Sequence, residues 1–231
     1  MNTTAIIVAA GKGSRMGHHM GKQYLPLVDK PILVHCLEVF EACALVDNVI
    51  LVVGADEIGF CSDLLYPFKF LKVSKIIAGG CDRQHSVYSG LQQLPSDTRI
   101  VLIHDGARPF VTVSILEASI DSSQKYGTGI VGMPVKDTIK VVDQNGYVRD
   151  TPDRNHLWMI QTPQTFQVDI IQKAHEKARE DGFIGTDDAM LVERMGGPVR
   201  MVTGSYENIK VTTQEDLYIG EAIIRSRQMG N

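Results

Sequence analysis

Residues 5–31 read AIIVAAGKGSRMGHHMGKQYLPLVDKP, and the rest of the chain is organised around this stretch. Its first six residues are apolar and partly β-branched, which is typical of a buried strand. The strand leads into residues 11–17, GKGSRMG, where glycines are interleaved with two cations. Glycine lets backbone N–H groups turn toward an anion without obstruction from a Cβ atom, and loops of this kind hold phosphates. We therefore expect a phosphate-binding loop with side-chain charge from Lys12, Arg15 and Lys22; a surface turn with solvated cations is the alternative.

Two common phosphate-binding motifs do not fit this loop. The dinucleotide fingerprint requires glycine at its sixth position, where the chain has Met16, and an acidic residue about 20 positions further on. A P-loop requires Gly-Lys followed by Ser or Thr, whereas Gly21 and Lys22 are followed by Gln23. These mismatches disfavour a dehydrogenase and predict a phosphate site of a different kind.

The composition of the 231-residue chain is that of an ordinary globular protein, with 44% hydrophobic and 22% charged residues. Its formal net charge of -4 argues against a general nucleic-acid-binding surface. No apolar run approaches the roughly 18 residues that span a membrane. The four cysteines form no Cys-x-x-Cys pair, and the seven histidines show no metal-ligand spacing. We therefore expect a cytoplasmic protein with neither a nucleic-acid nor a membrane partner.

Strand and helix patterns alternate along the chain, which predicts an α/β fold with a mainly parallel sheet flanked by helices. The expected strands span residues 5–10, 49–53, 75–78, 99–104, 129–133, 199–203 and 208–211, with an extended segment at 157–166. The expected helices span residues 31–44, 56–65, 82–94, 112–125, 168–181, 187–195 and a last segment opened by a capping box of Thr212 and Glu215. Ligands in such sheets lie beyond the carboxyl ends of the strands, where Gly11, Gly79 and Asp105 fall. No linker or repeat is evident, so we expect residues 1–231 to form one domain.

Residues 135–156 interrupt this alternation and predict a β-hairpin arm. Two short apolar runs flank DQNG at residues 143–146, and Asn-Gly is a strong hairpin signal. A two-stranded hairpin is marginal in water by itself. We therefore expect the arm to lie against a partner subunit rather than in solvent, which makes the protein a homodimer.

Six further motifs follow the glycine-rich loop. They are, in chain order, GGxxRxxSV at 79–87, HDxARP at 104–109, DTIK at 137–140, Arg154 with QTPQ at 161–164, TD at 186–187 and NIKVT at 208–212. The series resembles the family of 2-C-methyl-D-erythritol 4-phosphate cytidylyltransferases, nucleotidyltransferases of the non-mevalonate isoprenoid pathway. The resemblance covers nearly the whole chain; one departure is Gly21, where the family has proline before the lysine. Ribitol-5-phosphate cytidylyltransferases share most of these motifs and are the alternative.

The resemblance implies a Rossmann-like nucleotidyltransferase fold and transfer of a cytidylyl group from CTP to a small polyol phosphate, with release of pyrophosphate. It implies Mg²⁺ as the cofactor, held by the CTP phosphates or by Asp105, which is also a candidate for ribose binding. The implied catalytic residues are Arg15, Lys22, Arg154 and Lys210. The implied nucleotide-binding residues are Ala9, Ala10, Gly11, Lys12, Gly13, Gly79, Gly80, Arg83, Ser86, Asp105 and Ala107. The implied acceptor-binding residues are Arg108, Thr138, Arg154, Thr162, Thr186 and Lys210.

The chemistry of the reactants explains why cations dominate the catalytic set. A phosphate monoester has a second pKa of about 6, so its attacking oxygen is already mostly charged at neutral pH and needs no general base. The obstacle is repulsion between two polyanions, which positioned cations relieve. A nucleotide-binding regulator without turnover is the alternative from another class, but it would not need both phosphate-binding sets. Asp105 and Thr186 also have a simpler alternative as capping residues.

Overall fold

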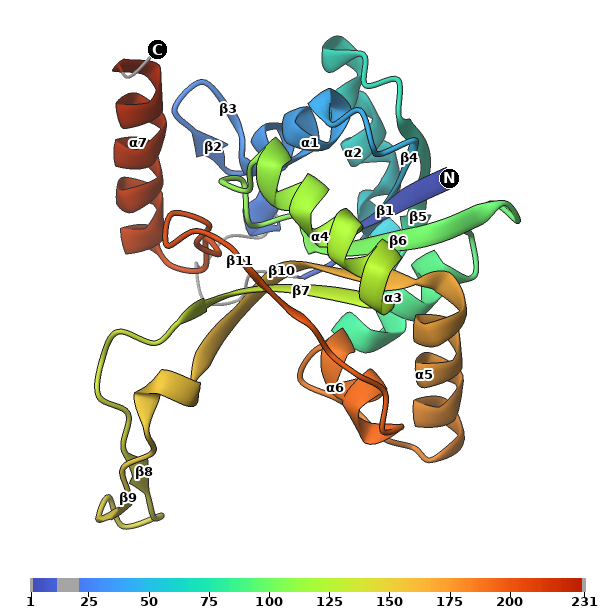
Figure 1. The fold of residues 1–231 in the computed structure, drawn as a ribbon. Coiled ribbons are helices and arrows are strands. Elements are labelled where there is room, and N and C mark those ends of the chain that lie inside the picture. The colour runs from blue at the N-terminus through green and yellow to red at the C-terminus, as the bar shows by residue number, and fades with distance from the viewer. Residues whose placement is uncertain (1, 12–20, 230–231) are drawn as a thin grey trace.

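Seven strands form the sheet on which the rest of the molecule is built. In the computed structural model, which describes residues 2–11 and 21–229, the strand order is β11-β7-β10-β6-β1-β4-β5 (Figure 1). The bounds are Asn2–Val8 for β1, Asn48–Val53 for β4, Val73–Ala78 for β5, Thr98–Asp105 for β6, Thr128–Pro134 for β7, Trp158–Gln167 for β10 and Met201–Thr203 for β11. β10 is antiparallel to both of its neighbours, and every other pair in this sheet is parallel. The predicted mainly parallel α/β sheet is therefore confirmed.

Helices bury both faces of this sheet. Their bounds are Ile32–Ala42 for α1, Ile58–Leu65 for α2, Arg83–Leu91 for α3, Val113–Tyr126 for α4, Val168–Glu180 for α5, Asp188–Arg194 for α6 and Gln214–Met229 for α7. Successive strand residues point to opposite faces, so Ile7 joins the apolar cluster that contains Leu37 of α1, whereas Ile6 joins the one that contains Val87 of α3 and Ile171 of α5. Burial on both sides explains the unbroken apolar run of β1. Among the helices in the described ranges, none is long and apolar enough to cross a membrane.

Capping side chains set several helix starts. The hydroxyl of Thr112 accepts a hydrogen bond from the backbone N–H three residues on, which confirms it as the cap of α4. Asp82 and Asp187 cap α3 and α6 in the same way. Asp82 also lines the cleft at the strand ends, and the first residue of α6, Asp188, pairs with Arg83 at the start of α3.

Two predicted elements differ from the structure. Residues 208–211 do not form a strand: Val211 N–H donates to the Ala107 carbonyl at 2.8 Å, but Val211 packs in the apolar cluster beneath α7 instead of joining the sheet. The apolar alternation there therefore serves packing alone. The helix expected from Asp56 begins instead as a 3-10 turn, residues 55–57, before α2.

The capping box of the last helix lies one residue later than predicted. The carboxylate of Asp216 accepts hydrogen bonds from the N–H groups of Thr212 and Thr213, at 2.7 and 2.9 Å. The hydroxyl of Thr213 in turn accepts from Asp216 N–H at 3.4 Å. Two overlapping Thr-x-x-acid frames occur here, and the structure uses Thr213 and Asp216 rather than Thr212 and Glu215.

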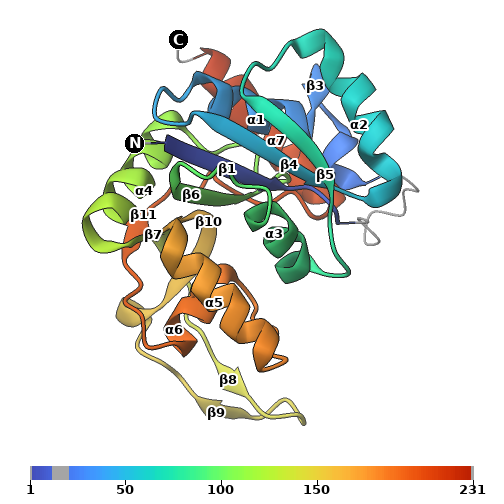
Figure 2. The ribbon, with the colours of Figure 1, turned by 90° about the vertical axis from the view of Figure 1, so that its right-hand side faces the viewer.

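The predicted arm is present as a hairpin of β8, Val141–Val142, and β9, Val148–Asp150. Gly146 adopts φ +85° in the turn, a conformation that favours glycine. Figures 1 and 2 both show the arm projecting away from the sheet. Its apolar side chains, among them Val142 and Tyr147, are exposed. The arm thus contributes almost nothing to the core of its own chain.

Candidate active site

A cleft of about 670 Å³ opens at the carboxyl ends of β1, β4, β5 and β6. Of the residues predicted from the sequence, it brings together Ala9, Ala10, Gly11, Lys22, Gly79, Gly80, Arg83, Ser86, Asp105, Ala107 and Lys210. The segments that follow β1, β5 and β6 therefore meet where a parallel sheet places them. Lys12, Gly13 and Arg15 lie outside the described residues.

Asp105, the last residue of β6, is a buried carboxylate surrounded by three cations. Its Oδ1 accepts a hydrogen bond from Arg83 Nε at 3.1 Å, and its Oδ2 lies 2.8 Å from Lys210 Nζ and 3.6 Å from Arg108 Nε. Burial by itself would raise the pKa of Asp105, but Arg83, Lys210 and Arg108 together hold that pKa well below its usual range. Asp105 is therefore ionised at neutral pH and fixes the three cations at the floor of the cleft.

Arg83 is held from its other side by a second buried carboxylate. Its NH1 group donates to Asp188 Oδ2 at 2.6 Å, and Asp188 Oδ1 lies 3.1 Å from His175 Nε2. The N–H of Asp188 donates to the side-chain oxygen of Gln164 at 3.0 Å. This network ties the start of α3 to β6, β10 and α6. The cleft is lined by the cations Lys22, Arg83 and Lys210 and by the carboxylates Asp56, Asp82 and Asp105. Three cations, Arg83, Arg108 and Lys210, gather on Asp105 at the floor, and such a cluster can bind an anionic ligand.

A chain of buried hydrogen bonds positions Asp105 and Arg108. His104 Nε2 lies 3.1 Å from the Arg108 carbonyl, which can only accept, so this nitrogen carries the proton. His104 Nδ1 then accepts from the Thr162 hydroxyl at 3.0 Å, and the Thr162 oxygen accepts from Asp105 N–H at 3.1 Å. Burial lowers the pKa of His104 to about 4, which keeps the ring neutral. Thr162 thus lies behind the cleft floor, with its hydroxyl used within this network.

Two glycines let the backbone approach the cleft closely after β5. A Cβ on Gly79 would lie 2.7 Å from Ser86 Oγ, and a Cβ on Gly80 would lie 2.3 Å from the Cβ of His85. Gly80 N–H donates to Ser86 Oγ at 3.1 Å, and Ser86 Oγ donates to the Asp82 carbonyl at 2.8 Å. The segment is compact enough to present backbone groups to a planar ligand.

Lys22 lies on a 3-10 turn, Lys22–Tyr24, whose place is set by a buried glutamine. The side-chain amide of Gln23 donates to the carbonyl of Ala9 at the end of β1. The carboxylate of Glu57, beyond β4, accepts from the Tyr24 hydroxyl at 3.2 Å. The turn that carries the lysine is therefore connected to two strand ends of the cleft.

Three predicted residues lie away from the cleft of their own chain. Thr138 and Arg154 flank the arm and are exposed, and Arg154 NH1 donates to the Lys136 carbonyl at 2.9 Å. Thr186 is exposed just before the cap of α6, with its hydroxyl 3.6 Å from Met190 Sδ. None of the three lines the cleft.

Comparisons with known proteins identify the family of this chain. The model of the IspD family, described as 2-C-methyl-D-erythritol 4-phosphate cytidylyltransferase, matches residues 3–226. The chain belongs to this family. The resemblance inferred from the motifs is therefore confirmed, and the protein is a cytidylyltransferase by family.

Individual relatives align with almost the whole length of this cytidylyltransferase. A protein of the same description from Caldanaerobacter subterraneus is 47% identical over 226 residues, covering 97% of this chain and 100% of the relative. One from Geobacillus kaustophilus is 49% identical over 228 residues, covering 98% and 99%. The crystal structure of 4-diphosphocytidyl-2C-methyl-D-erythritol synthase from Anaerococcus prevotii matches with a TM-score of 0.87 at 31% identity, covering 97% of this chain and 96% of that one.

Asp105 does not fit the role of a metal ligand in this cytidylyltransferase. Both of its carboxylate oxygens are already engaged by cations, and a divalent ion would have to enter among Arg83, Arg108 and Lys210. Mg²⁺ is bound in many enzymes through one or two carboxylates together with the phosphates of the substrate. The sequence predicted Mg²⁺ either on the CTP phosphates or on Asp105. The first of these two arrangements is compatible with the charges around Asp105.

Sequence reasoning missed the residues that hold the cleft from behind. Asp188 pairs with Arg83 although the two are 105 residues apart in the chain, and His175 contacts Asp188 in turn, so no local motif indicates either residue. Gln23 and Asp56 also belong to the lining of the cytidylyltransferase cleft. The one sequence signal for either residue is that Gln23 directly follows Lys22.

Proposed function

We propose that the chain transfers a cytidylyl group from CTP to 2-C-methyl-D-erythritol 4-phosphate, giving 4-diphosphocytidyl-2-C-methyl-D-erythritol and pyrophosphate. The observation that carries this proposal is the cluster of Arg83, Arg108 and Lys210 around Asp105, in a cleft also lined by Lys22. Cations gathered in this way in a concave site suit a triphosphate and a second phosphate. Family membership supplies the identities of donor and acceptor. The alternative acceptor, ribitol 5-phosphate, is not favoured by the names of the relatives above.

In this reaction an oxygen of the acceptor phosphate attacks the α-phosphorus of CTP. A new P–O bond forms, the bond from the α-phosphorus to the oxygen that bridges to the β-phosphorus breaks, and pyrophosphate leaves with the electron pair. Negative charge gathers on the α-phosphoryl oxygens, where Lys22 and Arg15 would stabilise it. Lys210 would bind the acceptor phosphate; its side chain is 37% exposed and is anchored by Asp105.

The nucleotide contacts follow from the strand ends. Backbone groups of residues 9–13, with Lys12, would wrap the triphosphate. Gly79, Gly80 and Ser86 would contact the edge of cytosine, because the glycines permit close backbone approach there. Asp105 and Ala107 would face the ribose, and Arg83 and Arg108 would support the pocket from the Asp105 network.

We infer that Mg²⁺ enters with CTP, on its phosphate oxygens. A bound Mg²⁺ would neutralise part of the triphosphate charge. Because the Asp105 network does not fit a divalent ion, no protein residue is assigned as its ligand. Replacing Mg²⁺ by EDTA in the assay should abolish pyrophosphate release; an undiminished rate without divalent cations would contradict the requirement.

We propose that the acceptor site is completed by the arm of a second subunit in a homodimer. The arm carries exposed apolar side chains, including Val142 and Val148, which water disfavours and a partner would cover. Arg154 and Thr138 lie at the base of this arm and are exposed, which suits binding of a phosphate from a neighbouring chain. A two-fold axis would place each arm at the other cleft at once. We assign Thr186 to the acceptor as well. Thr162, which the resemblance implied for the acceptor, is instead assigned to positioning, because its buried hydroxyl is engaged by His104 and Asp105.

Turnover assays test the proposed reaction directly. Pyrophosphate release from CTP and Mg²⁺ should require 2-C-methyl-D-erythritol 4-phosphate and should be much slower with ribitol 5-phosphate or with UTP. Tight CTP binding without pyrophosphate release would instead identify a regulator. Faster release with ribitol 5-phosphate would reassign the acceptor.

We infer that the reaction takes place in the cytoplasm. Cys36, Cys43 and Cys61 are buried free thiols, and Cys81 is an exposed one. Unpaired cysteines of this kind are typical of reducing compartments. Fractionation of cells that produce the tagged chain should place its activity in the cytoplasmic fraction, and activity confined to another fraction would contradict this inference.

A further inference from the structure

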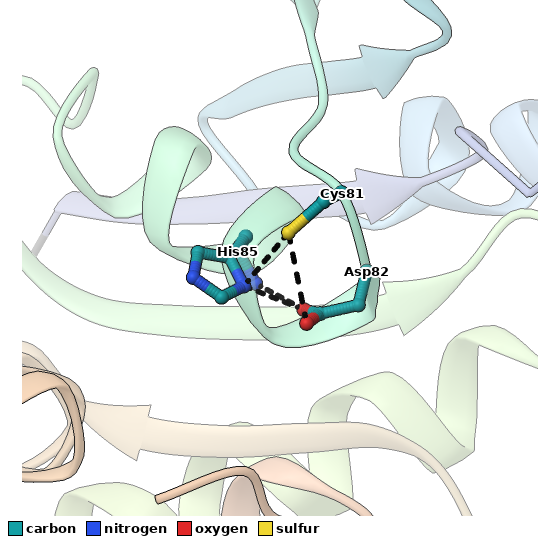
Figure 3. A group of neighbouring side chains, drawn as sticks. All are labelled: Cys81, Asp82 and His85. Carbon is teal, nitrogen blue, oxygen red and sulfur yellow. Dashed lines mark hydrogen bonds and ion pairs between the residues drawn. The ribbon is translucent and has the colours of Figure 1, made fainter. Parts of the chain in front are cut away.

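Cys81, Asp82 and His85 bring sulfur, oxygen and nitrogen ligand atoms together where α3 begins (Figure 3). Cys81 Sγ lies 3.5 Å from His85 Nδ1 and 3.9 Å from Asp82 Oδ2, and His85 Nδ1 lies 2.9 Å from Asp82 Oδ1. Within residues 2–11 and 21–229, no other group of three His, Cys, Asp or Glu side chains lies close enough to share an ion. The spacing of the histidines along the chain gave no sign of this group, because the neighbours of His85 in it are a cysteine and an aspartate.

The separation of the sulfur from the nitrogen fits tetrahedral coordination. Zinc bonds of about 2.3 Å to sulfur and about 2.0 Å to nitrogen or oxygen, at tetrahedral angles, separate sulfur from nitrogen by about 3.5 Å and nitrogen from oxygen by about 3.3 Å. The observed Cys81–His85 separation of 3.5 Å equals the first value. Cys81 Sγ lies 3.9 Å from Asp82 Oδ2, a few tenths of an ångström beyond the same value, whereas the 2.9 Å approach of His85 Nδ1 is to the other oxygen, Oδ1. Binding of one ion would require the Asp82 carboxylate to turn so that a single oxygen faces both Cys81 Sγ and His85 Nδ1.

The start of α3 holds two of these ligands in place before any ion binds. Asp82 is the helix cap, and its Oδ1 accepts from His85 N–H at 2.8 Å, which leaves Oδ2 available. The side chains of Asp82 and His85 are 37% and 44% exposed, so an ion can reach them. Thiolate and imidazole select zinc and similar ions, whereas Mg²⁺ prefers oxygen ligands. The chemistry of this set therefore differs from that of the Mg²⁺ carried by CTP.

We propose that Cys81, Asp82 and His85 form an inhibitory site for Zn²⁺ or a similar divalent transition-metal ion. Cys81 and Asp82 line the nucleotide cleft, so the open fourth position of the ion would be accessible from that cleft. The carbonyl of Asp82 also accepts from Ser86 Oγ at 2.8 Å, in the segment assigned to cytosine recognition. An ion here would place positive charge and its fourth ligand in the space of the nucleotide base, and would thereby slow turnover.

Binding is tested with the metal-free, full-length chain, using Co²⁺ as a spectroscopic probe for Zn²⁺. Co²⁺ should produce a thiolate-to-metal charge-transfer band, and Zn²⁺ should remove that band by displacement. Cys81→Ser should abolish the band, and both Cys81→Ser and His85→Asn should weaken Zn²⁺ binding by roughly 10- to 100-fold or more, since even residues outside the ligand shell contribute that much. This measurement does not depend on which reaction the cleft catalyses.

Two controls make the binding test specific. His156→Asn removes a histidine that is 3.8 Å from Asp153 and has no cysteine among its contacts, and Zn²⁺ binding should be unchanged. Replacing His18 and His19, which lie outside the described residues, tests the adjacent histidine pair in the sequence. Absence of the thiolate band in the unaltered chain, or loss of binding only in the His18 and His19 variant, would overturn the site.

Inhibition is measured at saturating Mg²⁺ and CTP as a fraction of the zinc-free rate of each variant. The concentration of Zn²⁺ for half-inhibition should rise at least about tenfold in Cys81→Ser, in parallel with the loss of binding. Equal inhibition of both proteins would show that Zn²⁺ acts on the CTP complex or elsewhere. Zn²⁺ binding at Cys81 without inhibition would overturn the inhibitory role.

Discussion

The cleft floor and the arm hold their charged side chains in opposite ways. At the floor, Asp105 and Arg83 are tied to residues that are distant in sequence, and the side chain of Asp105 is only 9% exposed. On the arm, Arg149 pairs with Asp143, a near neighbour along the chain, and the arginine side chain is 69% exposed. Charges fixed in a buried network need no rearrangement when charge develops in a reaction. The charged side chains of the cleft floor are therefore held in place within a single chain, whereas the position of those on the arm depends on what the arm contacts.

This contrast predicts that CTP binds to a site formed by a single chain, whereas the acceptor binds to a site that needs two associated subunits. The described part of the cleft, where we propose that CTP binds, is formed where the strand ends of one chain meet, at Gly79, Asp105 and their neighbours. The arm has few buried apolar contacts, which places it among the least stable parts of a fold. We expect CTP recognition to depend on the integrity of the Asp105 network, and acceptor recognition to depend on association of subunits.

The largest expected effect comes from removing the charge at the centre of the floor. Asp105→Asn leaves Arg83, Arg108 and Lys210 close together without their shared carboxylate, and should lower the free energy of unfolding by about 3–5 kcal/mol. Urea unfolding at neutral pH measures this loss. The matched variant Asp143→Asn removes a half-buried carboxylate on the arm, away from the core, and should leave the unfolding midpoint almost unchanged. Equal effects of the two variants would contradict the comparison.

A single cation of the cleft is expected to act mainly on the chemical step. Lys22→Ala should lower kcat by about 100- to 1000-fold, because preorganised charge at the α-phosphate contributes about 3–4 kcal/mol, while CTP affinity falls much less. Steady-state kinetics with a separate CTP-binding measurement distinguish the two. Lys30→Ala, whose lysine pairs with Glu38 at 2.7 Å outside the cleft, serves as the control and should retain activity. An unchanged kcat with weaker CTP binding would limit Lys22 to ground-state binding.

The buried histidine behind the floor predicts a dependence of stability on pH. Burial lowers the pKa of His104 to about 4 from an ordinary value of 6.5, so between these values the unfolded chain binds a proton that the folded chain does not. Stability from this residue is fully present above pH 6.5 and is lost as the pH falls toward 4. Between pH 7 and pH 5 the loss should be about 2 kcal/mol. Urea unfolding of His104→Asn should show a correspondingly smaller pH-dependent loss, and an identical loss in both proteins would exclude His104 as its source.

Changes on the arm are expected to affect association and not folding. Val142→Ser combined with Val148→Ser should weaken the dimer by roughly tenfold, because less apolar area is buried on association. The secondary structure seen by circular dichroism should be unchanged. Leu71→Ser removes a side chain that is 89% exposed elsewhere and should leave the dimer intact. Sedimentation equilibrium measures the association of the unaltered protein, the double arm variant and Leu71→Ser. Equal association of these three proteins would mean that the arm does not form the interface.

Local sequence signals predicted the sheet and much of the cleft, because each signal needs only a few neighbouring residues. The apolar run of β1, the glycines at 79 and 80 and the cap at Thr112 are examples. Ligand-binding segments then meet because the carboxyl ends of parallel strands share one edge. Even the departure at Gly21 is locally accommodated: its φ of -55° is one that proline would also adopt.

Long-range contacts could not be predicted in this way. The partners of Arg83 and Thr162 lie far along the chain, and their hydrogen bonds exist only once β6, β10 and α6 are assembled. The false strand at 208–211 arose because alternation of apolar residues does not distinguish a sheet from packing beneath α7. The Cys81 cluster was overlooked because its ligands combine a helix cap with one turn of α3.

Complementation between two inactive variants tests the division between cleft and arm most directly. Lys22→Ala damages the cleft, Arg154→Ala damages the base of the arm, and the two proteins are mixed under conditions of subunit exchange. If each site combines one cleft with the arm of the partner, the mixed dimer contains one doubly damaged site and one intact site, and should recover up to about half of normal activity. A mixture of Lys22→Ala with Lys210→Ala, both in the cleft, should recover none. Absence of recovery in the first mixture, with heterodimer formation demonstrated, would show that each active site is built from one chain.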